Sequence, residues 1–128
     1  MASDLGFDGG LTCSLGVRDF DRSAAWYQAN LGFELVYKVD EMGWGELKTP
    51  VDRVLLGLSQ VEKVEVKGGP TLTFGVKDIE AARALLERRH VRFDGETLTI
   101  PDMVKLATFY DLDGHKLMLY QSLGAPAG

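Results

Sequence analysis

Apolar and polar positions follow the same pattern twice along the chain. Residues 15–21 read LGVRDFD and residues 74–80 read FGVKDIE. Each segment is a short β-type run followed by an acidic residue and then by apolar positions at helical spacing. A repeat of this kind predicts two copies of one supersecondary unit.

One amphipathic helix is predicted in each repeat. Apolar residues at helical spacing favour a first helix over about residues 20–30, with Asp19 as its N-cap and Gly32 as its C-terminal stop. The same pattern favours a second helix over about residues 79–89, with Asp78 as its N-cap.

Three strand-like runs follow each helix, and one precedes it. The runs after the first helix are residues 33–39, 44–48 and 53–58, and those after the second are 91–100, 104–110 and 116–121. The order is therefore β-α-β-β-β repeated twice, an α+β fold. We expect a single domain over residues 1–128, with modules at about 11–59 and 70–121 and a charged linker at 60–69.

The composition is that of an acidic globular chain. Its 128 residues include 14 Lys and Arg against 19 Asp and Glu, a net charge of −5, and 45% are hydrophobic. These values argue against a disordered chain and against a general nucleic-acid binder. We recognise no signal peptide and no apolar run of the roughly 20 residues that cross a membrane. The single cysteine, Cys13, allows no internal disulfide and favours a cytoplasmic location.

Two motifs resemble the vicinal oxygen chelate superfamily, which contains glyoxalase I, bleomycin-resistance proteins and extradiol dioxygenases. The opening motif is VRDFDRS at 17–23, followed by WY at 26–27 and LGFEL at 31–35. The closing motif is FYDLDGHKL at 109–117, with Leu112 where proline is usual. The resemblance implies two βαβββ modules whose curved sheets surround a cleft. Because one fold serves many chemistries, the function has to be argued from the site.

The resemblance also implies four positions for metal ligands. In the superfamily's enzymes, His, Glu or Gln side chains near the start of each module's first strand and on its last strand hold a divalent metal. The matching residues here are Thr12, Leu56, Thr71 and Met118. None carries an imidazole or a carboxylate, which divalent catalytic metals need. We therefore expect no metal and no other cofactor.

Strand alternation predicts which side chains face the cleft. Small and hydroxyl-bearing residues alternate with bulky apolar ones in both first strands, so hydroxyls should face the cleft. The predicted ligand-binding residues are Thr12, Ser14, Trp44, Glu46, Leu56, Thr71, Thr73, Phe109, Met118 and Tyr120. Such a lining is typical of a small-molecule pocket. The structural alternatives are rim packing for Trp44 and a solvated strand charge for Glu46.

Two functions from different classes are open at this point. One is a metal-independent protein that binds an aromatic or drug-like small molecule, similar to the bleomycin-resistance branch, for antibiotic or toxin sequestration. The other is a lyase, isomerase or dioxygenase-like enzyme of the same superfamily with a non-standard or absent metal site. Glu46 is then the candidate general base. In either case the open sheet edges and the resemblance favour a homodimer.

Overall fold

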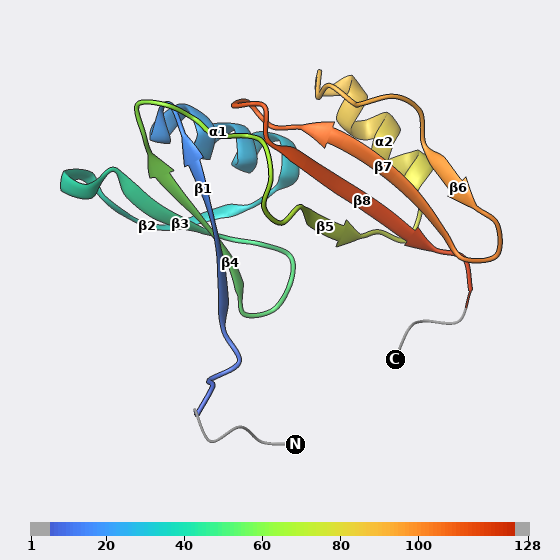
Figure 1. Cartoon of the computed structure of the whole chain (residues 1–128), viewed down its shortest axis with the longest axis horizontal. Coiled ribbons are helices and arrows are strands. Elements are labelled where there is room, and N and C mark those ends of the chain that lie inside the picture. The colour runs from blue at the N-terminus through green and yellow to red at the C-terminus, as the bar shows by residue number, and fades with distance from the viewer. Residues whose placement is uncertain (1–5, 125–128) are drawn as a thin grey trace. The chain divides into compact units, whose positions relative to one another are not determined.

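The computed structural model describes residues 6–124 (Figure 1). It consists of two four-stranded sheets, each with one helix packed against it. The chain divides into two units, Met1–Glu65 and Val66–Gly128. Each unit follows the order β-α-β-β-β. The predicted α+β fold of two βαβββ modules is confirmed, whereas the single-domain arrangement stays a prediction.

The first unit contains β1 (Leu11–Val17), α1 (Phe20–Leu31), β2 (Glu34–Val39), β3 (Trp44–Lys48) and β4 (Val54–Gln60). A short 3₁₀ turn, η1 (Asp40–Met42), connects β2 to β3. The strand order in the sheet is β1-β4-β3-β2. β4 pairs in parallel with β1 and antiparallel with β3. The edges of this sheet are therefore β1 and β2.

The second unit contains β5 (Leu72–Gly75), α2 (Ile79–Arg88), β6 (Leu98–Ile100), β7 (Val104–Tyr110) and β8 (Lys116–Ser122), in the sheet order β5-β8-β7-β6. The prediction of a strand from residue 91 to 100 is wrong in extent. Only β6 and an isolated bridge between Phe93 and Phe109 form there. Gly95, with a φ of 73°, interrupts the extended backbone between them.

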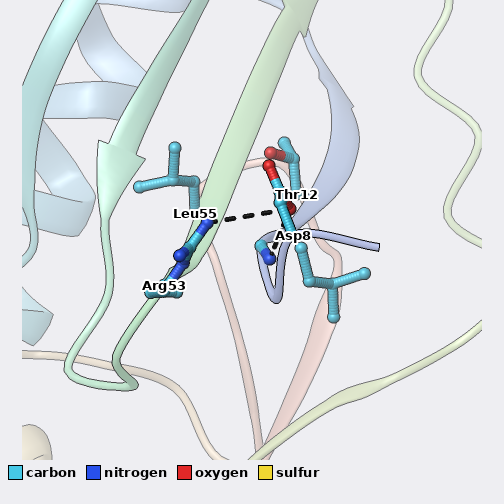
Figure 2. Close-up of a pocket in the computed structure, with 6 residues that line it drawn as sticks. Asp8, Thr12, Arg53 and Leu55 are labelled. Carbon is cyan, nitrogen blue, oxygen red and sulfur yellow. Dashed lines mark hydrogen bonds and ion pairs between the residues drawn. The ribbon is translucent and has the colours of Figure 1, made fainter. Parts of the chain in front are cut away.

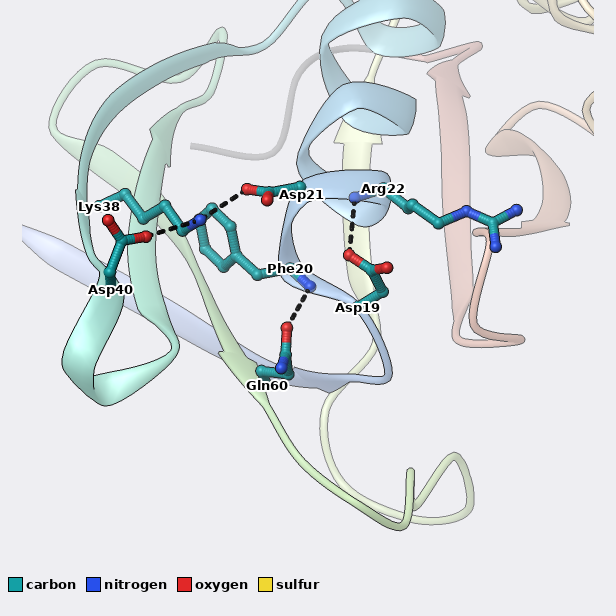
Figure 3. Close-up of polar contacts among 7 residues, drawn as sticks. All are labelled: Asp19, Phe20, Asp21, Arg22, Lys38, Asp40 and Gln60. Carbon is teal, nitrogen blue, oxygen red and sulfur yellow. Dashed lines mark hydrogen bonds and ion pairs between the residues drawn. The ribbon is translucent and has the colours of Figure 1, made fainter.

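The side chains of Asp19 and Gln60 hold the N-terminus of α1 (Figure 3). Asp19 Oδ1 accepts the backbone N–H of Arg22 at 3.2 Å, and Gln60 Oε1 accepts that of Phe20 at 2.9 Å. Two of the N–H groups that a helix start leaves free are thereby satisfied. Gly32 ends the helix with a φ of 72°, so the predicted cap and stop are both confirmed.

The second unit repeats this arrangement at the start of α2. Asp78 Oδ1 accepts the backbone N–H of Ala81 at 3.1 Å, which confirms the predicted N-cap. Gln121 Oε1, near the end of β8, accepts the N–H of Ile79 at 2.8 Å. In each unit, then, the last strand delivers a glutamine to the first turn of the helix and fixes the helix against the sheet.

Lys38 connects α1 to the strand and turn beside it (Figure 3). Its Nζ lies 2.7 Å from Asp21 and 2.8 Å from Asp40, and 5.3 Å from the ring centre of Phe20. Hydrogen bonds, first with Asp21 and then with Asp40, raise the pKa of Lys38 above its ordinary value. The ammonium group therefore stays charged at neutral pH and holds the helix start beside β2.

Each unit has its own hydrophobic core between helix and sheet. The first contains Val17, Phe20, Tyr27, Leu47, Leu56 and Leu58, and the second contains Ile79, Leu86, Phe109, Leu117 and Leu119. The opposite face of each sheet carries no helix of its own unit and is called here the open face. Neither helix in residues 6–124 is long and apolar enough to span a membrane.

Replacing Gln60 with alanine should lower the free energy of unfolding by about 1 kcal/mol, the usual net value of one hydrogen bond. The N–H of Phe20 loses its acceptor in this variant. Gln60→Glu keeps an acceptor oxygen beside the positive end of α1 and should retain most of the stability. Urea unfolding followed by circular dichroism measures both effects. Equal unfolding midpoints for wild type and Gln60→Ala would contradict this role of the glutamine.

Candidate ligand-binding site

The open face of the first sheet brings together four of the predicted site residues. Paired residues on neighbouring strands share a face of the sheet. The register aligns Ser14 of β1, Gly57 of β4 and Glu46 of β3 in one row. Thr12 and Trp44, two residues away on their strands, point to the same side. Thr12, Ser14, Trp44 and Glu46 therefore share one face.

The open face of the second sheet carries most of the remaining ones. Thr73 of β5 pairs with Met118 of β8, and Gly75 pairs with Tyr120. Thr73, Met118 and Tyr120 therefore lie on one side of this sheet. Thr71 comes just before β5, and its carbonyl accepts the hydroxyl of Thr73 at 3.3 Å. The Thr73 hydroxyl and the backbone of Thr71 thus lie together at the β5 edge of the sheet.

Leu56 and Phe109 lie on the opposite, helix-facing side, so the prediction that they line the open face is wrong. Leu56 pairs with Cys13 and Leu47, and Phe109 pairs with Leu117. Both side chains are 0% exposed. They belong to the cores of their units and have no surface to offer a ligand.

The unequal lengths of the two repeats explain the wrong placement of Leu56. The equivalent pairs are Cys13 with Leu56 and Leu72 with Leu117. Leu56 therefore matches Leu117, and the first-unit counterpart of Met118 is Gly57. Alternation fails in the same way on β7, where Thr108 and Tyr110 take the open face. Ala107, which pairs with Leu119, is buried as well.

Trp44, Tyr37 and Glu46 form a hydrogen-bonded chain on the open face of the first sheet. The indole Nε1–H of Trp44 donates to Tyr37 Oη at 2.9 Å. The hydroxyl of Tyr37 donates in turn to Glu46 Oε1 at 2.5 Å. The hydrogen bond with Glu46 raises the pKa of Tyr37, and the one from Trp44 acts in the opposite direction. The phenol therefore stays protonated at neutral pH and remains a donor to the carboxylate.

Sequence reasoning missed Tyr37. The pairing of β2 with β3 shifts between Leu35 and Tyr37, which indicates a bulge in β2. Leu35 pairs with Leu47 of the buried face, whereas Tyr37 pairs with Glu46 of the open face. Simple alternation puts residues 35 and 37 on the same face, so it gives no indication of this contact. The available signal was an aromatic residue on the strand next to Glu46.

The ring of Trp44 packs directly on Gly57. A Cβ atom added at Gly57 would lie 2.8 Å from Cζ2 and 2.9 Å from Cζ3 of the indole, too close for any side chain. Tyr120 is placed similarly in the second unit, where a Cβ at Gly75 would lie 2.9 Å from its Cζ and Oη. In both sheets a glycine leaves room for one aromatic ring on the open face.

The residues at the four positions implied for metal ligands do not fit a divalent metal. Thr12 and Thr71 offer hydroxyls, Met118 offers a thioether, and Gly57, in the place expected for Leu56, has no side chain. Divalent catalytic ions are held by imidazole and carboxylate groups. Among residues 6–124, no three His, Cys, Asp or Glu side chains gather so as to hold a metal ion.

A pocket of about 460 Å³ adjoins the open face at the start of β1 (Figure 2). Thr12 and Leu55 line it from the sheet, and Asp8 and Arg53 line it from the neighbouring loops. Asp8 Oδ1 lies 3.6 Å from the Arg53 guanidinium and accepts the N–H of Gly10 at 2.9 Å. The cationic group of this pocket therefore already faces a carboxylate.

Gly57→Ala should displace the indole of Trp44 and break its hydrogen bond with Tyr37. Overpacking of this kind costs about 1–3 kcal/mol of stability. Tryptophan emission, recorded in a Trp26→Phe background so that only Trp44 reports, should change. Gly16→Ala is the matched control, because a Cβ there meets only the two methyl groups of Val61, at 3.2 and 3.7 Å, so a shift of a few tenths of an ångström accommodates it. Unchanged Trp44 emission in Gly57→Ala would contradict the packing described.

Several solved structures share the fold of this chain. A superfamily member from Sphaerobacter thermophilus has a TM-score of 0.77 at 22% identity, covering 91% of this chain and 98% of that one. TnmS3, an antibiotic binding protein from a Streptomyces species, has a TM-score of 0.74 at 23% identity, covering 91% and 98%. The fosfomycin resistance protein FosX from Listeria monocytogenes has a TM-score of 0.75 at 14% identity, covering 91% and 94%.

The family of the chain is shown by its sequence. No curated protein matches it. Residues 11–119, however, match the family profile of the Glyoxalase/Bleomycin resistance protein/Dioxygenase superfamily, which spans both repeats and both motifs. The chain therefore belongs to the glyoxalase/bleomycin resistance protein/dioxygenase superfamily.

Proposed function

We propose that the protein is a metal-independent binding protein that sequesters an aromatic or drug-like small molecule, such as an antibiotic or a toxin. The observation that carries the proposal is the packing of Trp44 on Gly57. At one of the four positions that the resemblance implies for metal ligands, this chain has a glycine covered by an indole ring. An aromatic ring on an accessible face offers stacking area to a flat ligand.

Other side chains on the two open faces, each taken within its own unit, support the same function. Thr12, Ser14 and Thr73 are exposed on the open faces, so their small hydroxyl groups leave space and offer hydrogen bonds. Apolar and aromatic walls with a few polar groups are the usual composition of small-molecule sites. Met118, half-buried on the second open face, adds a flexible apolar side chain that adapts to irregular ligands.

Structural relatives point to the same class of function. TnmS3 is described as an antibiotic binding protein and FosX as a fosfomycin resistance protein. At 23% and 14% identity their likeness extends to the fold. The assignment of a sequestering role to this chain therefore depends on its own residues. A cytoplasmic location is part of the proposal and is supported by the single free cysteine, Cys13.

A thermal-shift screen of aromatic compounds and drug fragments, run in EDTA, should find ligands that raise the melting temperature. Adding Zn²⁺, Ni²⁺, Mn²⁺ or Fe²⁺ should neither stabilise the protein nor leave stoichiometric bound metal. Trp44→Ala should weaken a hit by about 1–3 kcal/mol if its ring stacks on the ligand. Thr73→Leu should block a hit that occupies the second open face, and calorimetry measures both effects.

The control for these variants is Trp26→Phe, which changes the other tryptophan, on α1, and should leave binding intact. Stoichiometric metal binding, or ligand binding that appears only after metal addition, would overturn metal independence. Equal binding of every hit by wild type, Trp44→Ala and Thr73→Leu would show that the open faces are not the site.

We also propose that the protein is a homodimer. Edge strands β2 and β6 expose large apolar side chains, among them Val36 at 55% and Leu98 at 65% exposure. Exposed strand edges with apolar side chains favour association, and a two-fold axis is the commonest way to close it. Light scattering at micromolar concentration should give twice the chain mass. A monomer mass would contradict the proposal.

A further inference from the structure

The hydrogen bonds among Trp44, Tyr37 and Glu46 run in one direction. The indole N–H donates to the phenol oxygen, and the phenol O–H donates to the carboxylate. A carboxylate accepts hydrogen bonds and donates none. Both donor protons of the group are therefore used within it. What remains for a ligand is the face of the indole and the free lone pairs of Glu46.

We propose that these three residues select a planar cation, that is, a flat aromatic molecule carrying a positive charge. The ring of the ligand stacks on Trp44 and its cationic edge lies beside Glu46. Tyr37 determines specificity, because it occupies the indole donor and fixes the carboxylate. The inference rests on the proposed function and deepens it by naming the ligand class and a further site residue.

The charges around the chain favour a cation. In the first unit the salt bridges of the described residues join Lys38, Arg53 and Lys63 to acidic partners other than Glu46. The negative charge of Glu46 is therefore available to a ligand. Lys48 lies on the same face, two positions along β3, or about 7 Å along the strand. It is exposed, so solvent screens its charge.

The indole is also held in place before any ligand arrives. Gly57 lies against one side of the ring, and Tyr37 holds its nitrogen at 2.9 Å. A fixed ring loses little freedom on binding, which favours affinity. Tryptophan is the side chain that attracts cations most strongly through its π face. An anionic aromatic molecule would instead meet the carboxylate and find no free donor on the three side chains.

Three probes that share the quinoline ring system test this inference by calorimetric titration at pH 8: N-methylquinolinium, neutral quinoline and anionic quinoline-2-carboxylate. Wild type should bind N-methylquinolinium about tenfold tighter than quinoline, since the cation–π and carboxylate contacts add to stacking. The carboxylate should bind weakest. Glu46→Gln should bring the ratio of cation to neutral affinity close to one. Asp52→Asn removes the same charge in the turn before β4 and should leave the ratio unchanged.

Tyr37→Phe separates a specific role from a structural one. It removes the hydrogen bond that fixes the Glu46 carboxylate, whereas the indole face on which quinoline stacks is retained. The preference for the cation should therefore fall severalfold, chiefly through weaker binding of N-methylquinolinium. A merely structural role would weaken both probes alike and keep the ratio. Circular dichroism of each variant establishes that the fold is retained.

The outcomes separate this inference from the proposed function. If the probes bind but Glu46→Gln keeps the preference for the cation, or if the carboxylate binds tightest, the inference is wrong and small-molecule binding stands. The same holds if no probe binds while the fragment screen finds other ligands. If neither the probes nor the screen gives binding, the proposed function fails together with the inference.

Discussion

The placement of β4 between β1 and β3 is the constraint on which the first unit depends. Leu56 and Leu58 are both 0% exposed against the helix side, and Gly57 between them faces the other way. Fully burying a leucine stabilises a fold by about 1.5–3 kcal/mol. A slip of one residue would expose both leucines, so the core fixes the register. The same register aligns Gly57 with Ser14 and Glu46 on the open face.

The two units share one framework of backbone and core but differ in the side chains on their open faces. In each, a glutamine from the last strand and an aspartate N-cap hold the helix start, with Gln60 and Gln121 in equivalent roles. In each, an aromatic ring lies on a glycine of the neighbouring strand. The ring is an indole in the first unit and a phenol in the second. The indole of Trp44 connects through Tyr37 to the carboxylate of Glu46. The frame is set by backbone and core, which leaves the open faces free to diverge.

What the sequence predicted well depended on local signals. Asp19, Asp78 and Gly32 act within one turn of their helices, and both helices begin where these residues indicate. Which face of the sheet Leu56 and Phe109 occupy depends on how their strands pair with strands distant in the sequence. Alternation counted from a single motif therefore places these two side chains one residue out of register. Tyr37 reaches Glu46 only because β2 contains a bulge. Register and bulges are tertiary properties, so their signals are not local.

The electrostatics of the first open face follow from its donor set. A face that held a divalent cation would attract oxygen anions, since the ion would be its largest local charge. Thr12 and Gly57 supply no ligands for such an ion. Glu46 then sets the sign of the charge beside the indole, and Tyr37 directs that charge by donating to one carboxylate oxygen. With a hydroxyl and a glycine at these positions and a carboxylate on the neighbouring strand, the charge beside the indole on this face is that of Glu46.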